Sequence, residues 1–202
     1  MTTKSTNISG QKILVHCDEE LSHLADWLLE VLNNLFPKNH KFIDGEKVTI
    51  GWSIVTLRKT NENEFTVFEP DFEGNPFTEE ISNVSYSLLI QAEQNQFAAS
   101  AKVAPLFVSF QDKIIIKKNC FDSNQLFMTR VEPNFKNNQS GWFIENRSKS
   151  NTKIVSEGDF VGIYAFELMK LQTSVVQVLG LPPGYMVIVD NDKIEVISPE
   201  HQ

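Results

Sequence analysis

The stretch that decides the fold runs from Lys12 to Pro37 and reads KILVHCDEELSHLADWLLEVLNNLFP. Its first six residues are mostly apolar and predict a buried strand, and Asp18 after them offers a helix N-cap. After Asp18, apolar residues recur at the spacing of a helix, and Pro37 ends the pattern. These apolar residues are Leu21, Leu24, Ala25, Leu28, Leu32 and Leu35. A strand followed directly by an amphipathic helix predicts an α+β fold.

A second apolar pattern, beyond this helix, predicts a hairpin. The segment from Lys47 to Leu57 is predicted to be a strand, because apolar residues alternate in it at Val48, Ile50, Trp52 and Ile54 before Val55 and Leu57 break the alternation. A polar turn separates it from a second strand at 64–68. Because Pro70 cannot donate a hydrogen bond to a sheet, we expect the chain to leave the sheet beside it. Trp52 is expected in the core.

A second helix is expected to begin near Thr78, which can cap it. Its buried side would be Ile81, Val84, Leu88, Leu89 and Ala92, and its polar side in water Asn83, Ser87, Gln91, Gln94 and Asn95. Two further strands are predicted at 113–118 and 125–131. These elements predict a first domain over residues 12–133, with a mixed or antiparallel sheet and two helices.

Residues 132–139 are polar, rich in asparagine and opened by a proline, which is typical of a linker. A smaller module is expected after them, over residues 140–198. Its predicted elements are a strand, an apolar helix and a hairpin, at 141–144, 166–179 and 185–197. A polar loop is expected at 146–151, and Trp142 is expected where the two halves meet. The predicted fold class is therefore α+β, with a strand–helix–hairpin module after the larger domain.

The stretch between Lys59 and Lys102 contains no basic residue. Its candidate partner-binding residues are Glu62, Glu64, Glu69, Asp71, Glu73, Glu79 and Glu80. A cluster of charges of one sign focuses an electrostatic field on an approaching molecule, which favours a basic partner protein. The alternative is a solvated face that only keeps the protein soluble.

The composition argues against two classes of partner. A net charge of −8 over 202 residues is unfavourable for binding nucleic acid or an anionic membrane, because both recruit clustered Lys and Arg.

Cys17 and Cys120 lie beside apolar residues and are expected to be buried thiols in a reducing compartment. The polar start, Met1–Gln11, is expected to fray and does not read as a signal peptide. A cytoplasmic location is the expectation.

The commonest nucleotide-binding and hydrolase motifs do not occur in the sequence. One tight polar group consists of His16, Cys17, Asp18 and His23. Neighbouring residues of a strand point to opposite faces, which disfavours a shared metal ion. Glu69 and Asp71 flank Pro70 like an acid–base pair, but the sequence around them does not predict a raised pKa. No catalytic, cofactor-binding or metal-binding residue is therefore assigned.

Several short motifs resemble those of a known family. They are Asp44-Gly45, Ile50-Gly51-Trp52, Phe68-Glu69-Pro70-Asp71-Phe72, Gln91, Ser140-Gly141-Trp142-Phe143-Ile144, Gly162-Ile163-Tyr164 and Leu181-Pro182-Pro183-Gly184. Through them, most of the chain is similar to bacterial polymorphic-toxin immunity proteins, and in particular to immunity family thirty-three.

The resemblance implies a cytoplasmic inhibitor that binds a secreted antibacterial toxin, delivered by a contact-dependent or type VI system, and blocks the toxin's active site. It implies neither catalysis nor a cofactor. The acidic stretch would then steer a basic toxin face into contact. Two alternatives come from other classes of protein: an adaptor or chaperone for a secreted effector, and, less favoured, a small hydrolase.

Overall fold

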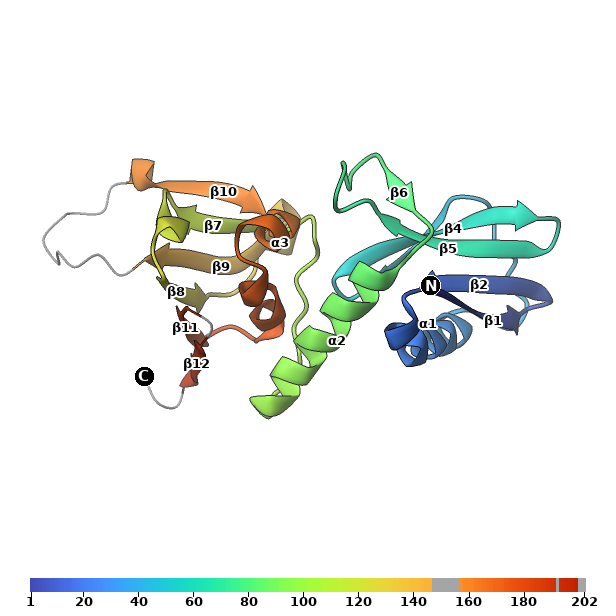
Figure 1. Ribbon diagram of the computed structural model, residues 1–202, viewed down its shortest axis with the longest axis horizontal. Coiled ribbons are helices and arrows are strands. Elements are labelled where there is room, and N and C mark those ends of the chain that lie inside the picture. The colour runs from blue at the N-terminus through green and yellow to red at the C-terminus, as the bar shows by residue number, and fades with distance from the viewer. Residues whose placement is uncertain (147–156, 192, 200–202) are drawn as a thin grey trace, which may run out of the picture. The chain divides into compact units, whose positions relative to one another are not determined.

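The computed structural model describes residues 1–146, 157–191 and 193–199. The chain divides into two compact units, an N-terminal unit of residues 1–92 and a C-terminal unit of residues 93–202 (Figure 1). Each unit is built on its own mixed sheet of six strands. The α+β class predicted from the sequence is confirmed.

The N-terminal sheet has the order β1-β2-β5-β4-β3, and the short strand β6 also pairs with β5. The strands are β1 (Thr2–Ile8), β2 (Gln11–Cys17), β3 (Glu46–Ile50), β4 (Ser53–Asn61), β5 (Glu64–Pro70) and β6 (Glu80–Ile81). Only the β2–β5 pair is parallel among these strands. The polar start of the chain, expected to fray, is instead the antiparallel edge strand β1, because each of its residues pairs with β2.

Helix α1 (Ser22–Leu35) is the helix predicted from the leucine pattern, and it packs on this sheet. Its Leu28 and Leu32 lie in one core with Ile13 and Val15 of β2, all nearly inaccessible to water. Burial of each of these leucines contributes about 2 kcal/mol. The expected cap is wrong: the Asp18 side chain caps no helical N–H, and the single turn η1 (Glu19–Leu21) leads into the helix instead.

The single strand expected over Lys47–Leu57 is in fact two strands, β3 and β4, which pair as a hairpin around Gly51 and Trp52. Gly51 has a φ of +54°, a conformation that favours glycine, so the chain can reverse there. The reversal explains why the apolar alternation shifts register in this stretch. Trp52 is fully buried, as predicted.

The second helix, α2, spans Ser85–Ser100 and begins later than predicted. Thr78 does not cap it, because the chain first forms β6, whose Glu80 pairs with Pro70 of β5. The two faces of the helix also differ from the prediction. Ser87, Gln91 and Gln94 are buried, whereas Leu89 is 40% exposed.

The C-terminal sheet has the order β10-β7-β9-β8-β11-β12. Its strands are β7 (Lys113–Lys117), β8 (Gln125–Arg130), β9 (Gln139–Asn146), β10 (Phe160–Tyr164), β11 (Met186–Asp190) and β12 (Lys193–Ile197). Only the β7–β9 pair is parallel among these strands. The predicted hairpin of β11 and β12 is confirmed.

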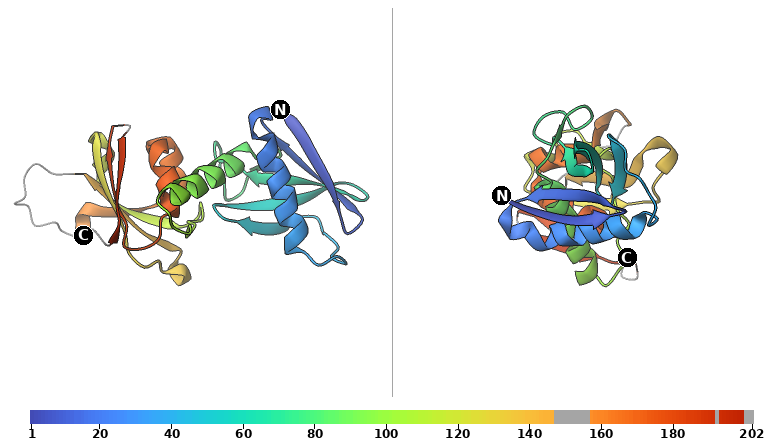
Figure 2. Two further views of the ribbon diagram at one scale, coloured as in Figure 1. Left: turned by 90° about the horizontal axis from the view of Figure 1, so that it is seen from below. Right: turned by 90° about the vertical axis from the view of Figure 1, so that its right-hand side faces the viewer.

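Short helical segments complete this unit. They are η2 (Cys120–Asp122), η3 (Phe135–Asn137), η4 (Glu157–Asp159), η5 (Ala165–Glu167), α3 (Leu168–Leu171) and η6 (Thr173–Gly180). The single helix predicted over 166–179 is therefore a short α-helix followed by a 3₁₀ segment. Figure 2 shows α3 and η6 together on one side of the sheet.

The second half of the chain is larger than predicted. Strands β7 and β8 were expected in the first domain, but both pair with β9 in the C-terminal sheet. The expected linker at 132–139 connects β8 to its antiparallel neighbour β9 and contains the turn η3. The compact units instead divide between Ala92 and Glu93, within α2. The polar loop expected at 146–151 lies, beyond Asn146, outside the described residues.

Three further observations bear on the sequence predictions. Cys17 and Cys120 are both buried free thiols, as expected. Trp142, expected where the two halves meet, is buried beside Arg130 and Leu179, which belong to its own unit. None of the helices in the described residues is long and apolar enough to cross a lipid bilayer.

Candidate functional site

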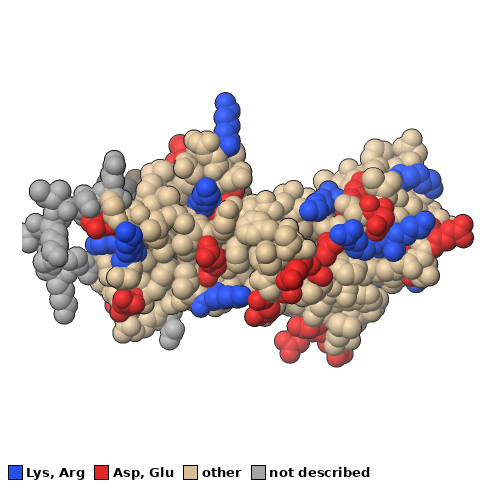
Figure 3. All heavy atoms as spheres, turned by 90° about the horizontal axis from the view of Figure 1, so that it is seen from above, with Lys and Arg blue, Asp and Glu red and all other residues tan. Residues whose placement is uncertain are grey.

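The acidic stretch is less uniform in space than in sequence, because basic residues from outside the stretch reach into it. Lys12 of β2 lies 3.1 Å from Glu64, and Arg58 of β4 forms an ion pair with Glu80. The Asn61 side chain and Lys12 hold the pKa of Glu64 below its ordinary value. In Figure 3, acidic side chains of the N-terminal unit are interspersed with lysines and arginines. The lack of basic residues within the stretch itself therefore does not leave Glu64 and Glu80 without compensating charge.

Glu69 does not contribute to the surface at all, being only 1% exposed. Its two carboxylate oxygens accept hydrogen bonds from the backbone N–H groups of Tyr86, at 3.3 Å, and Ser87, at 2.7 Å. Burial raises the pKa of Glu69 to about 7, against the opposing effect of these hydrogen bonds. Glu69 thus holds the first turn of α2 against β5, and its assignment as a residue that contacts a partner is corrected to a structural role.

The remaining candidates lie mostly in the segment 71–79, which we call the acidic loop. Asp71 accepts hydrogen bonds from the backbone N–H groups of Glu73 and Gly74, and Glu79 accepts one from Asn75. These bonds fix the loop, so its carboxylates are held in place on the surface. Outside the loop, Glu62 is exposed on the turn between β4 and β5.

Aromatic side chains lie beside the acidic loop. The Tyr86 hydroxyl donates a hydrogen bond of 2.9 Å to Glu73, which raises the pKa of Tyr86. Tyr86 is 38% exposed, and Phe77, within the loop, is 44% exposed. A surface that combines large exposed rings with fixed carboxylates is suited to protein recognition, because aromatic residues are enriched at the centres of interfaces. The sequence prediction identified the charges here but not the rings.

The two units differ sharply in charge. Residues 1–92 carry fourteen Asp and Glu against seven Lys and Arg, a net charge of −7, while the remaining residues carry twelve against eleven, a net charge of −1. Nearly all of the excess negative charge therefore belongs to the N-terminal unit. The net attraction of a basic partner over long distances would therefore come mainly from that unit.

Gly51, Trp52 and Gln91, singled out in the sequence, meet in the N-terminal unit. The Gln91 carbonyl oxygen accepts a hydrogen bond from the backbone N–H of Trp52 at 3.2 Å. A Cβ atom at position 51 would lie 1.7 Å from the same oxygen. The three residues therefore lock α2 to the β3–β4 turn, which is a structural role and not a binding site.

Arg130 organises the C-terminal unit, and the sequence prediction missed it. The side chain is 2% exposed and donates hydrogen bonds to the backbone carbonyls of Leu106, Ser140, Leu179 and Leu181. Its guanidinium also lies 5.7 Å from the centre of the Trp142 ring. Burial lowers the pKa of Arg130 to about 10, which still leaves it charged at neutral pH. The sequence does hold a signal for this role. Arg130 follows Met128 by two residues in β8, so it lies on the same, core-facing side of the strand.

The motifs around Arg130 are structural. Ser140 Oγ accepts a hydrogen bond from the Trp142 backbone N–H and donates one to the Lys113 carbonyl. A Cβ atom on Gly141, whose φ is +81°, would lie 2.1 Å from the Val131 carbonyl oxygen. Gly184 donates a backbone hydrogen bond of 2.7 Å to the Arg130 carbonyl. These motifs bring β8, β9 and the segment before β11 together.

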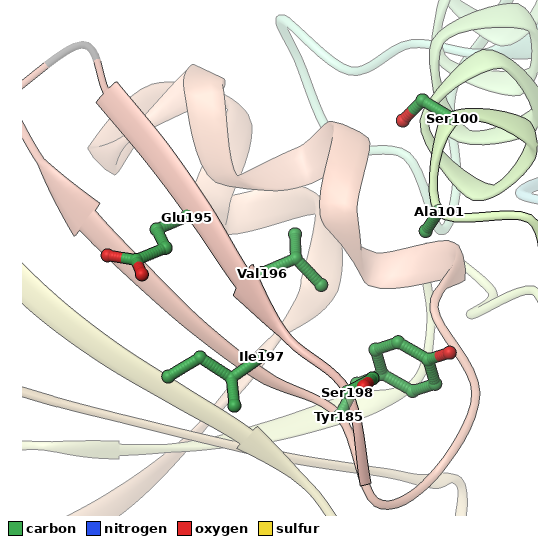
Figure 4. A pocket seen from close by; sticks show the side chains of 7 residues that line it. All are labelled: Ser100, Ala101, Tyr185, Glu195, Val196, Ile197 and Ser198. Atoms are coloured by element: carbon green, nitrogen blue, oxygen red, sulfur yellow. The ribbon is translucent and has the colours of Figure 1, made fainter. Parts of the chain in front are cut away.

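A hollow of about 500 Å³ lies beside β12 (Figure 4). It is lined by Ser100, Ala101, Tyr185, Glu195, Val196, Ile197 and Ser198. In Figure 4, Val196 points toward Ser100 and Ala101, whereas Glu195 and Ile197 project from the other side of the strand. The lining supplies hydroxyl groups and one carboxylate, and Glu195 lies on the side of the strand away from Ser100.

His16, in the polar group weighed above as a metal site, takes part in the pairing of two strands. His16 Nδ1 lies 2.8 Å from Thr3 Oγ1, within a hydrogen bond between β1 and β2. Within residues 1–146, 157–191 and 193–199, no three His, Cys, Asp or Glu side chains are grouped closely enough to hold a metal ion.

A comparison with models of protein families gives a match. Residues 93–200 match the family model of the Imm33-like domain, which covers more than half of the chain and nearly all of the C-terminal unit. The motifs from Asp44 to Gln91 lie outside the matched range. No curated protein and no solved structure matches the chain.

Proposed function

The chain belongs to the Imm33-like family, an immunity protein family, and we propose that it binds and neutralises a cognate antibacterial toxin by covering the toxin's active site. The observation that carries the proposal is the match over residues 93–200. In this proposal the chain makes and breaks no covalent bond, and its effect is that of a tightly bound inhibitor.

The charge of the N-terminal unit supports a basic toxin. With a net charge of −7, this unit attracts a positive surface from a distance and raises the rate of encounter. The residues proposed to act in this way are the exposed Glu62, Glu73 and Glu79 and the half-buried Asp71. Glu64 and Glu80 contribute less, because Lys12 and Arg58 partly neutralise them. Tyr86 and Phe77 would pack against the toxin once it has docked.

A killing assay tests the proposed function directly. The strain that carries this gene is the attacker, and the recipient is the same strain with this gene and the gene of the cognate toxin deleted. Expression of the chain in the recipient should restore survival, and the toxin recovered in complex with it should keep its unmodified mass. Continued killing of the complemented recipient would refute the proposal, and a covalently altered toxin would indicate an enzyme.

The role of the acidic surface is tested with the double variant Glu62→Lys/Glu73→Lys. Its association with the purified toxin domain should slow about tenfold at about 50 mM salt, and the loss should shrink as salt screens the charges. The matched control is Glu20→Lys/Glu30→Lys, which reverses the same charge at exposed positions on η1 and α1. Equal slowing by both variants would mean that only total charge matters, and the specific surface assignment would then fail.

A further inference from the structure

The C-terminal sheet has one buried and one open face, and the burial alternates along its four central strands, β7, β9, β8 and β11. In β7, Ile114 and Ile116 are buried whereas Ile115 between them is not, and in β9 Phe143 is 39% exposed between the buried Trp142 and Ile144. The inner face packs toward α3 and η6 (Figure 2). Successive residues of a strand point to opposite faces, so the partly exposed set forms a second face of the sheet.

This open face is apolar where antiparallel sheets usually present polar side chains to water. The strand pairings place one continuous row across all six strands: Gly162, Ile115, Phe143, Thr129, Met186 and Ile197. A second row beside it contains Phe127 next to Ile188, with Glu145 and Glu195 as their neighbours. Opposite Phe160 in β10 lies Lys117. The face is thus an aromatic and aliphatic stripe with a few charges of both signs.

We propose that this open face of the C-terminal sheet is where the cognate toxin packs. The inference rests on the proposed function and adds to it the surface that supplies most of the affinity. The family match covers every strand of this sheet, and an immunity family implies a toxin partner. Because the C-terminal unit has a net charge of only −1, long-range attraction contributes little there, and the exposed apolar side chains of this face are what it offers to a partner.

The size of the face favours a toxin over a second copy of this chain. Six strands at about 4.8 Å spacing and five residues in length span roughly 24 Å by 16 Å, or about 400 Å² in projection. Stable homodimers bury at least about 1,000 Å² on each partner, whereas a standard complex buries about 800 Å² on each side around a smaller apolar centre. The face has the dimensions of such a centre, with Phe143 in its middle.

The test measures the affinity of the full chain for the toxin domain purified from the attacker strain. Phe143→Thr removes the central ring and keeps a residue that favours strands, so the dissociation constant should rise about thirtyfold, with little dependence on salt. Ile115→Thr, on the neighbouring strand, should raise it about fivefold to tenfold. The matched control is Phe135→Thr, which removes a 64% exposed ring from the turn η3 and should change the affinity by less than about twofold.

Thermal unfolding of each variant confirms that it is folded at the temperature of the assay. Wild-type affinity in both Phe143→Thr and Ile115→Thr would overturn the inference while leaving the proposed function intact. The wild-type chain could also associate with itself. If Phe143→Thr abolishes that self-association and leaves the toxin affinity unchanged, the face binds a second copy of this chain, and the inference is overturned. A wild-type chain that does not bind the toxin would overturn the proposed function and this inference together.

Discussion

Glu69 makes the stability of the N-terminal unit depend on pH in an unusual direction. Its carboxyl group is 1% exposed, and burial raises its pKa to about 7 from an ordinary value of 4.5. The folded chain therefore binds this proton more tightly than the unfolded chain does. Lowering the pH through 7 should stabilise the fold, whereas a typical ion-paired carboxylate loses stability as the pH falls.

The size of the effect follows from the two pKa values. At about pH 8 the Glu69 carboxyl is ionised in both the folded and the unfolded chain, so its protonation adds nothing to the free energy of unfolding. At about pH 5.5 it is protonated in the folded chain and ionised in the unfolded chain, which adds about 2 kcal/mol to the free energy of unfolding. Below the unfolded pKa of 4.5 the gain levels off at about 3 kcal/mol.

The Glu69→Gln variant isolates this contribution, because other acidic groups titrate equally in the variant and its parent. Urea denaturation is followed by tryptophan fluorescence in a Trp142→Phe background, which leaves only Trp27 and Trp52, both in the N-terminal unit, as reporters. The difference in unfolding free energy between the parent chain and the Glu69→Gln variant should change by about 2 kcal/mol between about pH 8 and pH 5.5. In the control variant Glu62→Gln, which changes an exposed residue, the unfolding free energy should depend on pH as it does in the parent. If the unfolding free energies of the Glu69→Gln variant and its parent change with pH by the same amount, the reasoning is refuted.

Two further substitutions test the structural centres of the two units. Gly51→Ala forces a residue with a Cβ into a φ of +54° and against Gln91, so it should destabilise the chain by about 2 kcal/mol or more, and Gln91→Ala in the same chain should recover part of the loss. Additive losses in thermal unfolding would contradict that contact. Arg130→Met removes hydrogen bonds to four carbonyl groups and should cost about 3 kcal/mol or more, while an unchanged melting temperature would show that the bonds contribute little.

The sequence predicted the elements whose signal is local. The α1 leucines, the β2 run and the β11–β12 hairpin each follow from a short pattern in neighbouring residues, and each is present. Two of the wrong predictions depended on distant partners. The strand β1 has no apolar pattern and forms because β2 pairs with it, and the linker expected at 132–139 is a hairpin connection because β8 and β9 lie side by side.

Polar residues in α2 misled the prediction for a related reason. Gln91 and Gln94 look like solvent-facing residues, but each is buried and hydrogen-bonded to a backbone group, at Trp52 and Val176 respectively. A buried amide is stable only when its partners are provided elsewhere in the fold, and a helical pattern does not record those partners. The same reasoning applies to Glu69, whose partners are the N–H groups that begin the helix.

The C-terminal motifs that resemble the immunity family consist mostly of residues that shape the fold, and they differ from most of the residues proposed to contact a toxin. Ser140, Gly141 and Trp142 are held around Arg130, and Gly184 donates to its backbone, so these motifs specify how the C-terminal unit folds. A partner contacts side chains that reach the surface, and the motif contains one such residue, Phe143, which points away from the core between two buried neighbours. Replacement of Phe143 leaves the Arg130 contacts untouched, whereas replacement of Gly141 disrupts them through Val131. On the proposal that Phe143 contacts the toxin, recognition and folding separate within a single short motif, and toxin affinity measured beside melting temperature in variants of positions 141 and 143 would show the division.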